Sequence, residues 1–392
     1  MRAPPRTLLA ACLCASACAR RIAGVTVQVD VPASVCDAFA YGARGDGVAD
    51  DTTAVQAAIT ACAAGGTALL PANGSFLTFG LAVPSSAANF ALQIEGLLRF
   101  SNDTAAWGKA ASGQCLALAG RSIALHGGGV VDGQGAAWWP CAKAGCARPT
   151  LVNARGVAGL LITGGLTFRD SPNHNLELYA SPMEVAHVSI LAPSSTPGSS
   201  LVSHNTDGID VHGQPAYIHD VLISTGDDHI AFHANDTLVE ACTFGTGHGT
   251  SVGSLGDGTN LKNITVRDST FENATCVARI KADGASSGAL RDVLWRNISS
   301  RGAGITIQVT SNYPGTGPGT GTLAMHNVSF DGISSSGAAE AGQFLCSPNA
   351  PCTALALRGV VHSPAPATGW SCANAHGAAT GDISPPLTCL LP

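Results

Sequence analysis

Residues 205–249 read NTDGIDVHGQPAYIHDVLISTGDDHIAFHANDTLVEACTFGTGHG, a stretch in which short polar clusters recur between apolar segments. Asp207 and Asp227 are 20 residues apart, and so are Asp228 and His248. A period near 20 in a chain rich in glycine and β-forming residues is typical of a solenoid. Residues one period apart then stack on neighbouring coils, about 4.8 Å from each other. This spacing predicts the fold.

A fourth cluster, Arg279-Ile280-Lys281, begins 31 residues after His248. Stacked coils would bring the three acids Asp207, Asp227 and Asp228 together with the histidine and the two cations. Cleavage of a glycosidic bond needs one protonated carboxyl group and one ionised carboxylate. Like charges held close together raise the pKa of one carboxyl group, which keeps it protonated. The pattern therefore predicts carbohydrate chemistry.

Short apolar runs broken by Gly, Asn, Asp, Ser and Pro fill most of the remaining chain. We expect strands within residues 122–125, 159–163, 185–191, 216–224, 237–244, 261–271, 290–298 and 322–333. Two-residue hairpin turns such as Asn-Gly are nearly absent between these runs, which disfavours an antiparallel sandwich. An all-β chain of parallel coils is predicted, with loops at 193–203 and 314–321.

One amphipathic helix is expected, with Asp50 or Asp51 as its N-cap and Gly65-Gly66 after its end. Its apolar face recurs at i, i+3, i+4 and i+7, on Val55, Ala58, Ile59 and Cys62. A single helix of this kind can cover the open end of a solenoid.

The composition excludes several classes of protein. Of 392 residues, 12% are charged, 5% are aromatic and 47 are glycine, a mixture too apolar for a disordered chain and too rich in glycine for a helical one. The formal net charge is −6, which argues against nucleic acid or an anionic membrane as the main partner. A local basic site at Arg279 and Lys281 still permits an anionic substrate. We expect a monomer.

The N-terminus has the pattern of a secretory signal. Arg2 and Arg6 precede an apolar segment at 8–15, and Ala17-Cys18-Ala19 follows as a cleavage site. We therefore expect a signal peptide at 1–19, a secreted, extracellular domain at 20–392, and no membrane span. Glycosylation sequons fit this compartment and begin at Asn73, Asn102, Asn235, Asn263, Asn273, Asn297 and Asn327.

Cysteine usage agrees with an oxidising compartment. Eleven cysteines lie outside the expected leader, and the predicted disulfides are Cys141–Cys146, Cys346–Cys352, Cys372–Cys389 and Cys36–Cys62. Cys115, Cys242 and Cys276 remain, and an odd total leaves at least one free thiol. No C-x-x-C pair exists, which argues against a metal bound by cysteine.

Several motifs occur in the order found in one family. They are 41–47 (YGARGDG) with 50–52 (DDT), 131–135 (VDGQG) with Trp138-Trp139, 205–210 (NTDGID), 226–228 (GDD), 247–254 (GHGTSVGS) and 279–281 (RIK). Through these motifs the chain resembles glycoside hydrolase family 28, the polygalacturonases. The resemblance implies a single-stranded right-handed parallel β-helix, the pectin-lyase-like solenoid, acting on polygalacturonate (pectin) without a cofactor or metal. It also implies direct displacement with inversion.

The resemblance assigns roles to four residues. Asp227 would be the general acid, Asp207 and Asp228 would hold the attacking water, and His248 would belong to the catalytic site. Because neighbouring strand residues point to opposite faces, the chain must bend near Gly226 if both adjacent aspartates are in the site.

A substrate-binding role for Arg279 and Lys281 follows from their spacing. At i and i+2 both side chains project from one strand face, where arginine can grip a carboxylate through two hydrogen bonds and lysine adds a point charge. This pair favours galacturonate over a neutral sugar. Asn205 and Asp210 are candidates for contacts with sugar hydroxyls. Tyr313 resembles an aromatic residue that borders the cleft in the family.

The chain departs from the family pattern at His229, where relatives often have a cysteine paired with one before the Gly-His-Gly motif. Cys242 persists here, so we expect it to be unpaired unless it bonds to Cys276. His229 would add a titratable group near the acids and could shift the pH optimum.

Three alternatives remain. One is a hydrolase of rhamnogalacturonan or xylogalacturonan. Another is a pectate lyase that holds Ca²⁺ through Asp207, Asp210, Asp227 and Asp228. The third is a wall-binding protein without turnover, which intact acids and His248 disfavour.

Overall fold

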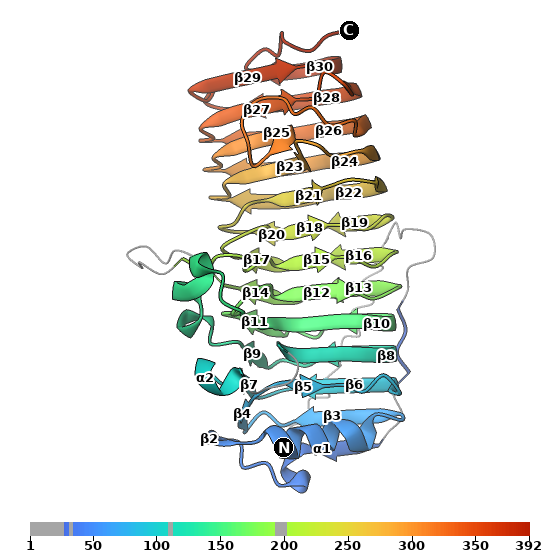
Figure 1. Ribbon diagram of the computed structural model, residues 1–392, viewed down its shortest axis with the longest axis vertical. Helices are drawn as coiled ribbons and strands as arrows, with labels where there is room; N and C mark the ends of the chain where they lie inside the picture. The colour runs from blue at the N-terminus through green and yellow to red at the C-terminus, as the bar shows by residue number, and fades with distance from the viewer. Residues whose placement is uncertain (1–26, 31–33, 109–112, 193–201) are drawn as a thin grey trace, which may run out of the picture.

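The structure is a computed structural model that describes residues 27–30, 34–108, 113–192 and 202–392. It is a right-handed parallel β-helix, as predicted: a tall stack of coils with its ends at opposite poles (Figure 1). The expected signal peptide and residues 193–201 of the first expected loop lie outside the described residues. The second expected loop is confirmed, because 314–321 fall between two strands.

Each coil adds strands to three parallel ladders. The first ladder contains β1 (Val35–Asp37), β3 (Gly66–Leu70), β6 (Ala88–Ile94), β8 (Gln114–His126), β10 (Thr150–Ile162), β13 (Met183–Ala186), β16 (Ala216–His219), β19 (Thr237–Glu240), β22 (Thr259–Glu272), β24 (Gly288–Arg301), β26 (Ala324–Ser336), β28 (Cys352–His362) and β30 (Ala375–Ser384). The second contains β2 (Asp46–Asp50), β4 (Ser75–Thr78), β7 (Leu97–Phe100), β9 (Val130–Asp132), β11 (Thr167–Arg169), β14 (Ser189–Leu191), β17 (Leu222–Ser224) and β20 (Thr243–Phe244), and it continues in the second half of β22. The third joins parts of β8 and β10 to β5 (Leu81–Ala82), β12 (Leu176–Tyr179), β15 (Ile209–Val211), β18 (Ile230–Phe232), β21 (Thr250–Leu255), β23 (Cys276–Asp283), β25 (Ile305–Tyr313), β27 (Glu340–Leu345) and β29 (Thr368–Ala373).

The core is a column of apolar side chains inside the coils. Strand residues alternate between the two faces of a sheet, so each strand sends every second side chain inward. On the third ladder, Val211 pairs with Phe232, Phe232 with Val252 and Val252 with Ile280, and all four are fully buried. Because the coils are in register, like residues stack on like, and the residues between them are presented outward in rows.

Helix α1 (Thr52–Cys62) covers the N-terminal end of the stack, as predicted (Figure 1). Its first residue is held by Asp50, whose carboxylate accepts a 2.9 Å hydrogen bond from the Thr52 N–H. Asp51 occupies the N-cap position, but its carboxylate accepts from the Arg44 and Gly45 N–H groups instead. Other helical segments are short: η1 (Ala38–Tyr41), α2 (Thr104–Trp107), η2 (Gly135–Ala137) and η3 (Trp139–Ala144).

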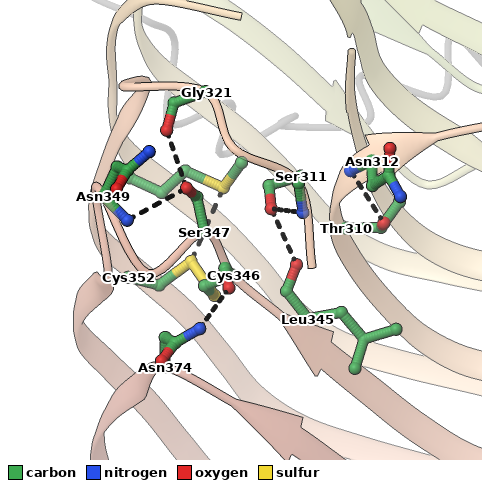
Figure 2. Close-up of a disulfide and its surroundings, with 12 residues drawn as sticks. Thr310, Ser311, Asn312, Gly321, Leu345, Cys346, Ser347, Asn349, Cys352 and Asn374 are labelled. Carbon is green, nitrogen blue, oxygen red and sulfur yellow. Dashed lines mark hydrogen bonds between the residues drawn. A yellow bond between two sulfur atoms is a disulfide. The ribbon is translucent and has the colours of Figure 1, made fainter. Parts of the chain in front are cut away.

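All four predicted disulfides are present, and Cys115, Cys242 and Cys276 are buried free thiols. The expectation that Cys242 is unpaired is therefore confirmed. Figure 2 shows the Cys346–Cys352 bridge between β27 and β28, where Asn374 of the next coil donates to the Cys346 carbonyl and Ser347 to the Gly321 carbonyl. Among the described residues, no helix is long and apolar enough to cross a membrane.

Candidate active site

Three of the four polar clusters, those of Asp207, of Asp227 and Asp228, and of His248, lie in the turns that connect strands of the second ladder to strands of the third. The register that aligns β15, β18 and β21 places the residues two positions earlier, Asp207, Asp228 and His248, on successive coils. The Gly208 N–H donates to the Asp228 carbonyl, so the pairing continues into the turn. The stacking partner of Asp207 is thus Asp228, and Asp227 is brought in by a bend.

That bend occurs at Gly226. A side chain at this position would place its Cβ 2.0 Å from the Ser203 carbonyl oxygen, so only glycine fits. The Gly226 N–H donates to the Thr206 hydroxyl at 2.9 Å, and the Asp228 N–H donates to the Asp227 carboxylate at 2.9 Å. Carboxylate oxygens of both aspartates and a ring nitrogen of His248 all lie within 4.8 Å of one another. The predicted bend is confirmed.

His248 is fixed against Asp227 from two sides. Its Nδ1 lies 2.9 Å from the Asp227 carboxylate, and its backbone N–H donates to the Asp227 carbonyl at 2.8 Å. Gly249 has a φ of +93°, and a Cβ there would lie 2.3 Å from the Cys276 carbonyl oxygen. The glycine after the histidine therefore lets the chain pass close to the next coil and directs the imidazole to the acid.

The cationic pair reaches Asp228 from β23, two coils further along the stack. Lys281 Nζ lies 2.5 Å from the Asp228 carboxylate, and Arg279 Nη1 lies 3.7 Å from its other oxygen. Ser251 donates to Asp228 at 2.7 Å. Ile280 between the two cations is fully buried, so the predicted orientation of the strand is confirmed. Asp228 is 1% exposed, and this ion pair makes its burial as an anion tolerable.

Tyr313 also borders the cations. Its ring centroid lies 4.9 Å from Cζ of Arg279 and 5.3 Å from Nζ of Lys281, within the range of a cation–π contact. Gln308, paired with Arg279 in the ladder, accepts a 3.0 Å hydrogen bond from its Nε. The aromatic residue expected at the cleft thus lies beside the predicted carboxylate-binding pair.

Asp207 and Asp210 share a histidine that sequence reasoning missed. His174 Nδ1 lies 2.7 Å from Asp210, and its Nε2 lies 3.7 Å from Asp207. His174 stands two residues before β12, as Asp207 stands two residues before β15. Extending the repeat alignment by one coil toward the N-terminus would have found it.

Asn205 is engaged within the protein. Its side-chain oxygen accepts a 3.1 Å hydrogen bond from Arg148, whose other guanidinium nitrogen donates to the Pro172 and His204 carbonyls. Asn205 and Asp210, predicted to contact sugar hydroxyls, are therefore held by Arg148 and His174. Arg148 lies between β9 and β10, far from the repeat motifs in sequence, and no periodicity points to it.

The acids differ in their electrostatic surroundings. Burial, reinforced by the Asp210 and Asp227 carboxylates, raises the pKa of Asp207 well above its usual value. Burial also raises the pKa of Asp228, although Lys281 opposes the change. Burial would raise the pKa of Asp227 too, but the hydrogen bond and charge of His248 outweigh it, and this pKa is lowered. Without substrate, the cluster holds its proton on Asp207.

Contacts with the same acids keep His174 and Lys281 positively charged. Burial would lower the pKa of His174, but its contacts with Asp210 and Asp207 raise it to about 9. The pKa of Lys281 is likewise raised by Asp228 despite burial. Both groups are positively charged at neutral pH, which balances the negative charge of the carboxylates that they contact.

His229 does not belong to this cluster, contrary to the expectation that it would titrate beside the acids. Its ring is fully buried against Phe244 and Phe271. One nitrogen lies 3.0 Å from the Gly245 carbonyl, and the other accepts from the Gly249 N–H. Burial lowers its pKa to about 4, so the ring stays neutral. Here the imidazole stabilises the turn where relatives often have a disulfide.

A metal ion fits this cluster poorly. Asp227, Asp228 and His248 have suitable ligand atoms, but both oxygens of Asp228 already accept hydrogen bonds, from Lys281 and Ser251. A cation placed there would also lie close to the Lys281 ammonium. The arrangement is suited to proton transfer and to recognition of an anionic group.

Known proteins share this architecture. The family model of the glycosyl hydrolases family 28 matches residues 68–382. A probable polygalacturonase of Arabidopsis thaliana is 28% identical over 377 residues, covering 88% of this chain and 82% of the relative. Endo-xylogalacturonan hydrolase A of Aspergillus tubingensis is 33% identical over 249 residues, 61% of each chain. A solved polygalacturonase from Erwinia carotovora ssp. carotovora has a TM-score of 0.76 at 22% identity and covers 91% of this chain.

The chain is therefore a glycoside hydrolase. It belongs to the glycosyl hydrolases family 28, because the family model covers most of its length and the fold is shared with solved members named polygalacturonase and endo-xylogalacturonan hydrolase.

Proposed function

We propose that the protein is a polygalacturonase, which hydrolyses the α-1,4 bonds of galacturonate in pectin by a single displacement with inversion. One observation carries this proposal. Asp228, whose N–H donates to the Asp227 carboxylate, lies against Lys281 and Arg279, so groups that could cleave a glycosidic bond adjoin groups that could hold a sugar carboxylate. The names of relatives and of structural neighbours support the same substrate class.

In the proposed reaction, Asp227 gives its proton to the glycosidic oxygen as the bond from that oxygen to the anomeric carbon breaks. A water molecule attacks the anomeric carbon from the opposite face, and its proton passes to Asp207 or Asp228. The products are two shorter chains, and the net change is the addition of one water. Asp228 is held by Lys281 and Ser251, which favours Asp207 as the group that accepts the proton of the water, after the proton that Asp207 holds in the free protein has passed to Asp227.

This assignment requires Asp227 to be protonated when substrate is bound, although its pKa is lowered in the free protein. A galacturonate carboxylate beside Lys281 would weaken the positive field on Asp227 and exclude water. Both effects raise the pKa of a carboxyl group. His248 Nδ1, 2.9 Å from Asp227, would then orient the acid. Proton transfer of this kind contributes about 10²–10⁴ to the rate.

Other substrates of the family remain competitors. A xylogalacturonan hydrolase is among the relatives, at 33% identity. The sugar backbone of xylogalacturonan would present the same carboxylate to Arg279 and Lys281. Rhamnogalacturonan would place a neutral sugar on one side of the scissile bond. The cationic pair favours plain galacturonate at the cleavage site, since arginine forks and carboxylates match in geometry.

A calcium-dependent lyase is disfavoured by the contacts of its would-be ligands. Asp210 is paired with His174 at 2.7 Å, and Asp228 with Lys281 at 2.5 Å. Calcium needs six to eight oxygen ligands, and here two of the four aspartates are committed to cations. Loss of activity on addition of a chelator, with an unsaturated product, would support the lyase.

The test is release of reducing ends from polygalacturonate, xylogalacturonan and rhamnogalacturonan by wild type, Asp227→Asn and Asp207→Asn. Wild type should prefer polygalacturonate, and both variants should release reducing ends from it far more slowly. A galacturonide with an activated leaving group needs no general acid, so it should restore turnover in Asp227→Asn but not in Asp207→Asn. Rescue of the wrong variant would exchange the two roles. Binding of polygalacturonate without any release of ends would mean a wall-binding protein.

The compartment follows as part of the same proposal. We infer that residues 1–19 direct secretion and that 20–392 act outside the cell, where pectin is found. The four disulfides support this, because such bonds persist in oxidising environments. N-terminal sequencing of the secreted protein should begin after residue 19.

A further inference from the structure

A second group of metal-binding side chains lies at a different corner of the same coils. His219 is the last residue of β16, and Asp220 follows it. His187 follows β13, whose last residue, Ala186, pairs with His219 in the first ladder. This corner joins the first ladder to the second, and β17 separates it along the chain from the bend at Gly226.

We propose that His187, His219 and Asp220 bind a divalent transition-metal ion of the zinc type. One ligand atom from each residue lies within 4.8 Å of the other two. Around a tetrahedral zinc ion, ligand atoms at about 2.0–2.2 Å from the metal are roughly 3.3 Å apart. His219 Nδ1 and Asp220 Oδ2 are now 2.7 Å apart. A small opening of this pair and a rotation of the exposed His187 ring would complete three ligands.

The support behind His219 matches a metal-binding histidine. Its other ring nitrogen, Nε2, lies 3.3 Å from the Glu184 carboxylate. Metal-bound imidazoles almost always donate their second N–H to such a group, which fixes the ring and makes the binding nitrogen more basic. The ring also stacks on Tyr217, with centroids 4.2 Å apart. His219 is therefore held with Nδ1 facing Asp220 before any ion arrives.

The two exposed ligands open onto solvent. His187 and Asp220 line a shallow surface hollow of about 330 Å³, together with Val188 and Leu222. The hollow leaves room for water in the fourth position of the ion. Imidazole and carboxylate ligands suit zinc, copper and nickel more than calcium, which takes oxygen ligands.

Ion pairing without a metal would explain the arrangement of His219, Glu184 and Asp220, but not that of His187. A charged His219 between Glu184 and Asp220 would be a stable arrangement without metal. It would give no role to His187, whose ring lies edge-on to His219 with centroids 5.5 Å apart. The catalytic cluster differs, because there the Lys281 ammonium is already paired with the Asp228 carboxylate. At this corner the charged groups that bear on His219 are Glu184 and Asp220, both acidic.

A bound ion would tie the coil of β13 and β14 to the coil of β16 and β17. It would stabilise the folded chain by mass action, because the unfolded chain does not hold the three residues together. Nothing in this role depends on the proposed substrate.

The test is calorimetric titration of the full-length secreted protein with Zn²⁺, after removal of metal by a chelator. Wild type should bind one ion at this site and melt at a higher temperature with it, and Co²⁺ should give the visible absorption of a tetrahedral site. His187→Asn and Asp220→Asn should lose binding while keeping activity and the melting temperature without metal. Asn tolerates the positive φ of His187, 55°, and that of Asp220, 51°, so both variants should fold. Glu184→Gln should bind about 10–100-fold more weakly.

His326→Ala, which removes an exposed histidine on a distant coil, is the matched control and should bind as wild type does. The proposal is wrong if His187→Asn and Asp220→Asn retain wild-type affinity. It is also wrong if wild type binds no Zn²⁺, or if the bound ion is lost in His248→Ala instead, which would place it at the catalytic cluster.

Discussion

The coils that carry the candidate active site differ from those near the C-terminus. Between β12 and β20 each strand has two to four residues, and separate turns join the three ladders. From β22 to β28, the strands of the first ladder run for 11–14 residues, most of them passing around a corner without a break. Figure 1 shows this change as short arrows in the middle of the stack and long ribbons above.

The two kinds of corner use polar residues differently. In the long strands a single residue of positive φ turns the corner, and stacked side chains such as Asn327 and Asp292 bond to each other at 2.7 Å. In the short-strand coils the turn before the third ladder holds Asp207, Asp227 and His248. The long strands thus pass the corner with a paired side chain, while the turns between short strands present the acids and the imidazole of the candidate site.

The largest expected effect is in the broken coils. Asp227→Asn should lower kcat on polygalacturonate about 10²–10⁴-fold, because the amide cannot donate the proton needed by the leaving oxygen. Its melting temperature should stay close to that of wild type. Asp331→Asn, in the long strand β26, is the matched control and should leave kcat unchanged. Steady-state kinetics and thermal melts check both, and equal activity of the two variants would contradict the assignment.

Removal of the partner of Asp228 should affect stability as well as activity. Lys281→Met leaves a carboxylate that is 1% exposed without its ammonium, which should cost about 3–5 kcal/mol. Lys262→Met, on β22, should change stability by less than about 0.5 kcal/mol. Denaturant unfolding measures the difference. Equal stability of the two variants would show that the Lys281–Asp228 pair does not matter to the fold.

The contribution of His174 should depend on pH. Its pKa is about 9 in the folded chain and 6.5 in the unfolded one, so the folded state binds the proton more tightly. The resulting stabilisation is complete below pH 6.5 and disappears as the pH rises through 9. The gap in melting temperature between wild type and His174→Gln should therefore be widest near pH 6 and narrow toward pH 9. A constant gap would mean that His174 is not charged in the fold.

The smallest effect is expected at a corner of the long strands. Asn327→Ala loses the bond to Asp292 and puts alanine at a φ of 54°, which should cost about 1–2 kcal/mol. Activity should not change. Asn327→Gly, which relieves the backbone but still lacks the side chain, separates the two causes. Loss of kcat in either variant would show that the long coils also shape the site.

Much of this could be predicted because the solenoid repeats. The period near 20 predicted the stacking, the pattern of Val55, Ala58 and Ile59 predicted the capping helix, and short spacings predicted three of the disulfides. The convergence of Lys281 and Asp228, which lie two coils apart, followed from the same register.

The features that could not be predicted depend on contacts between residues that the repeat does not relate. Arg148 reaches Asn205 from 57 residues away, and no repeat relates them. His229 looked like a member of the acid cluster because it follows Asp228, yet the turn before β18 directs its ring into the core against Phe244 and Phe271. Resemblance to a family also says nothing of the corner formed by His187, His219 and Asp220.

The most direct test of the account is proton NMR of the first products released from polygalacturonate. If Asp227 protonates the leaving oxygen while Asp207 and Asp228 direct water to the opposite face, the newly formed reducing ends must appear first as the β-anomer. The α-anomer appearing first would mean retention and a covalent intermediate, and an unsaturated product would mean elimination. Either result would contradict hydrolysis by direct displacement at this site.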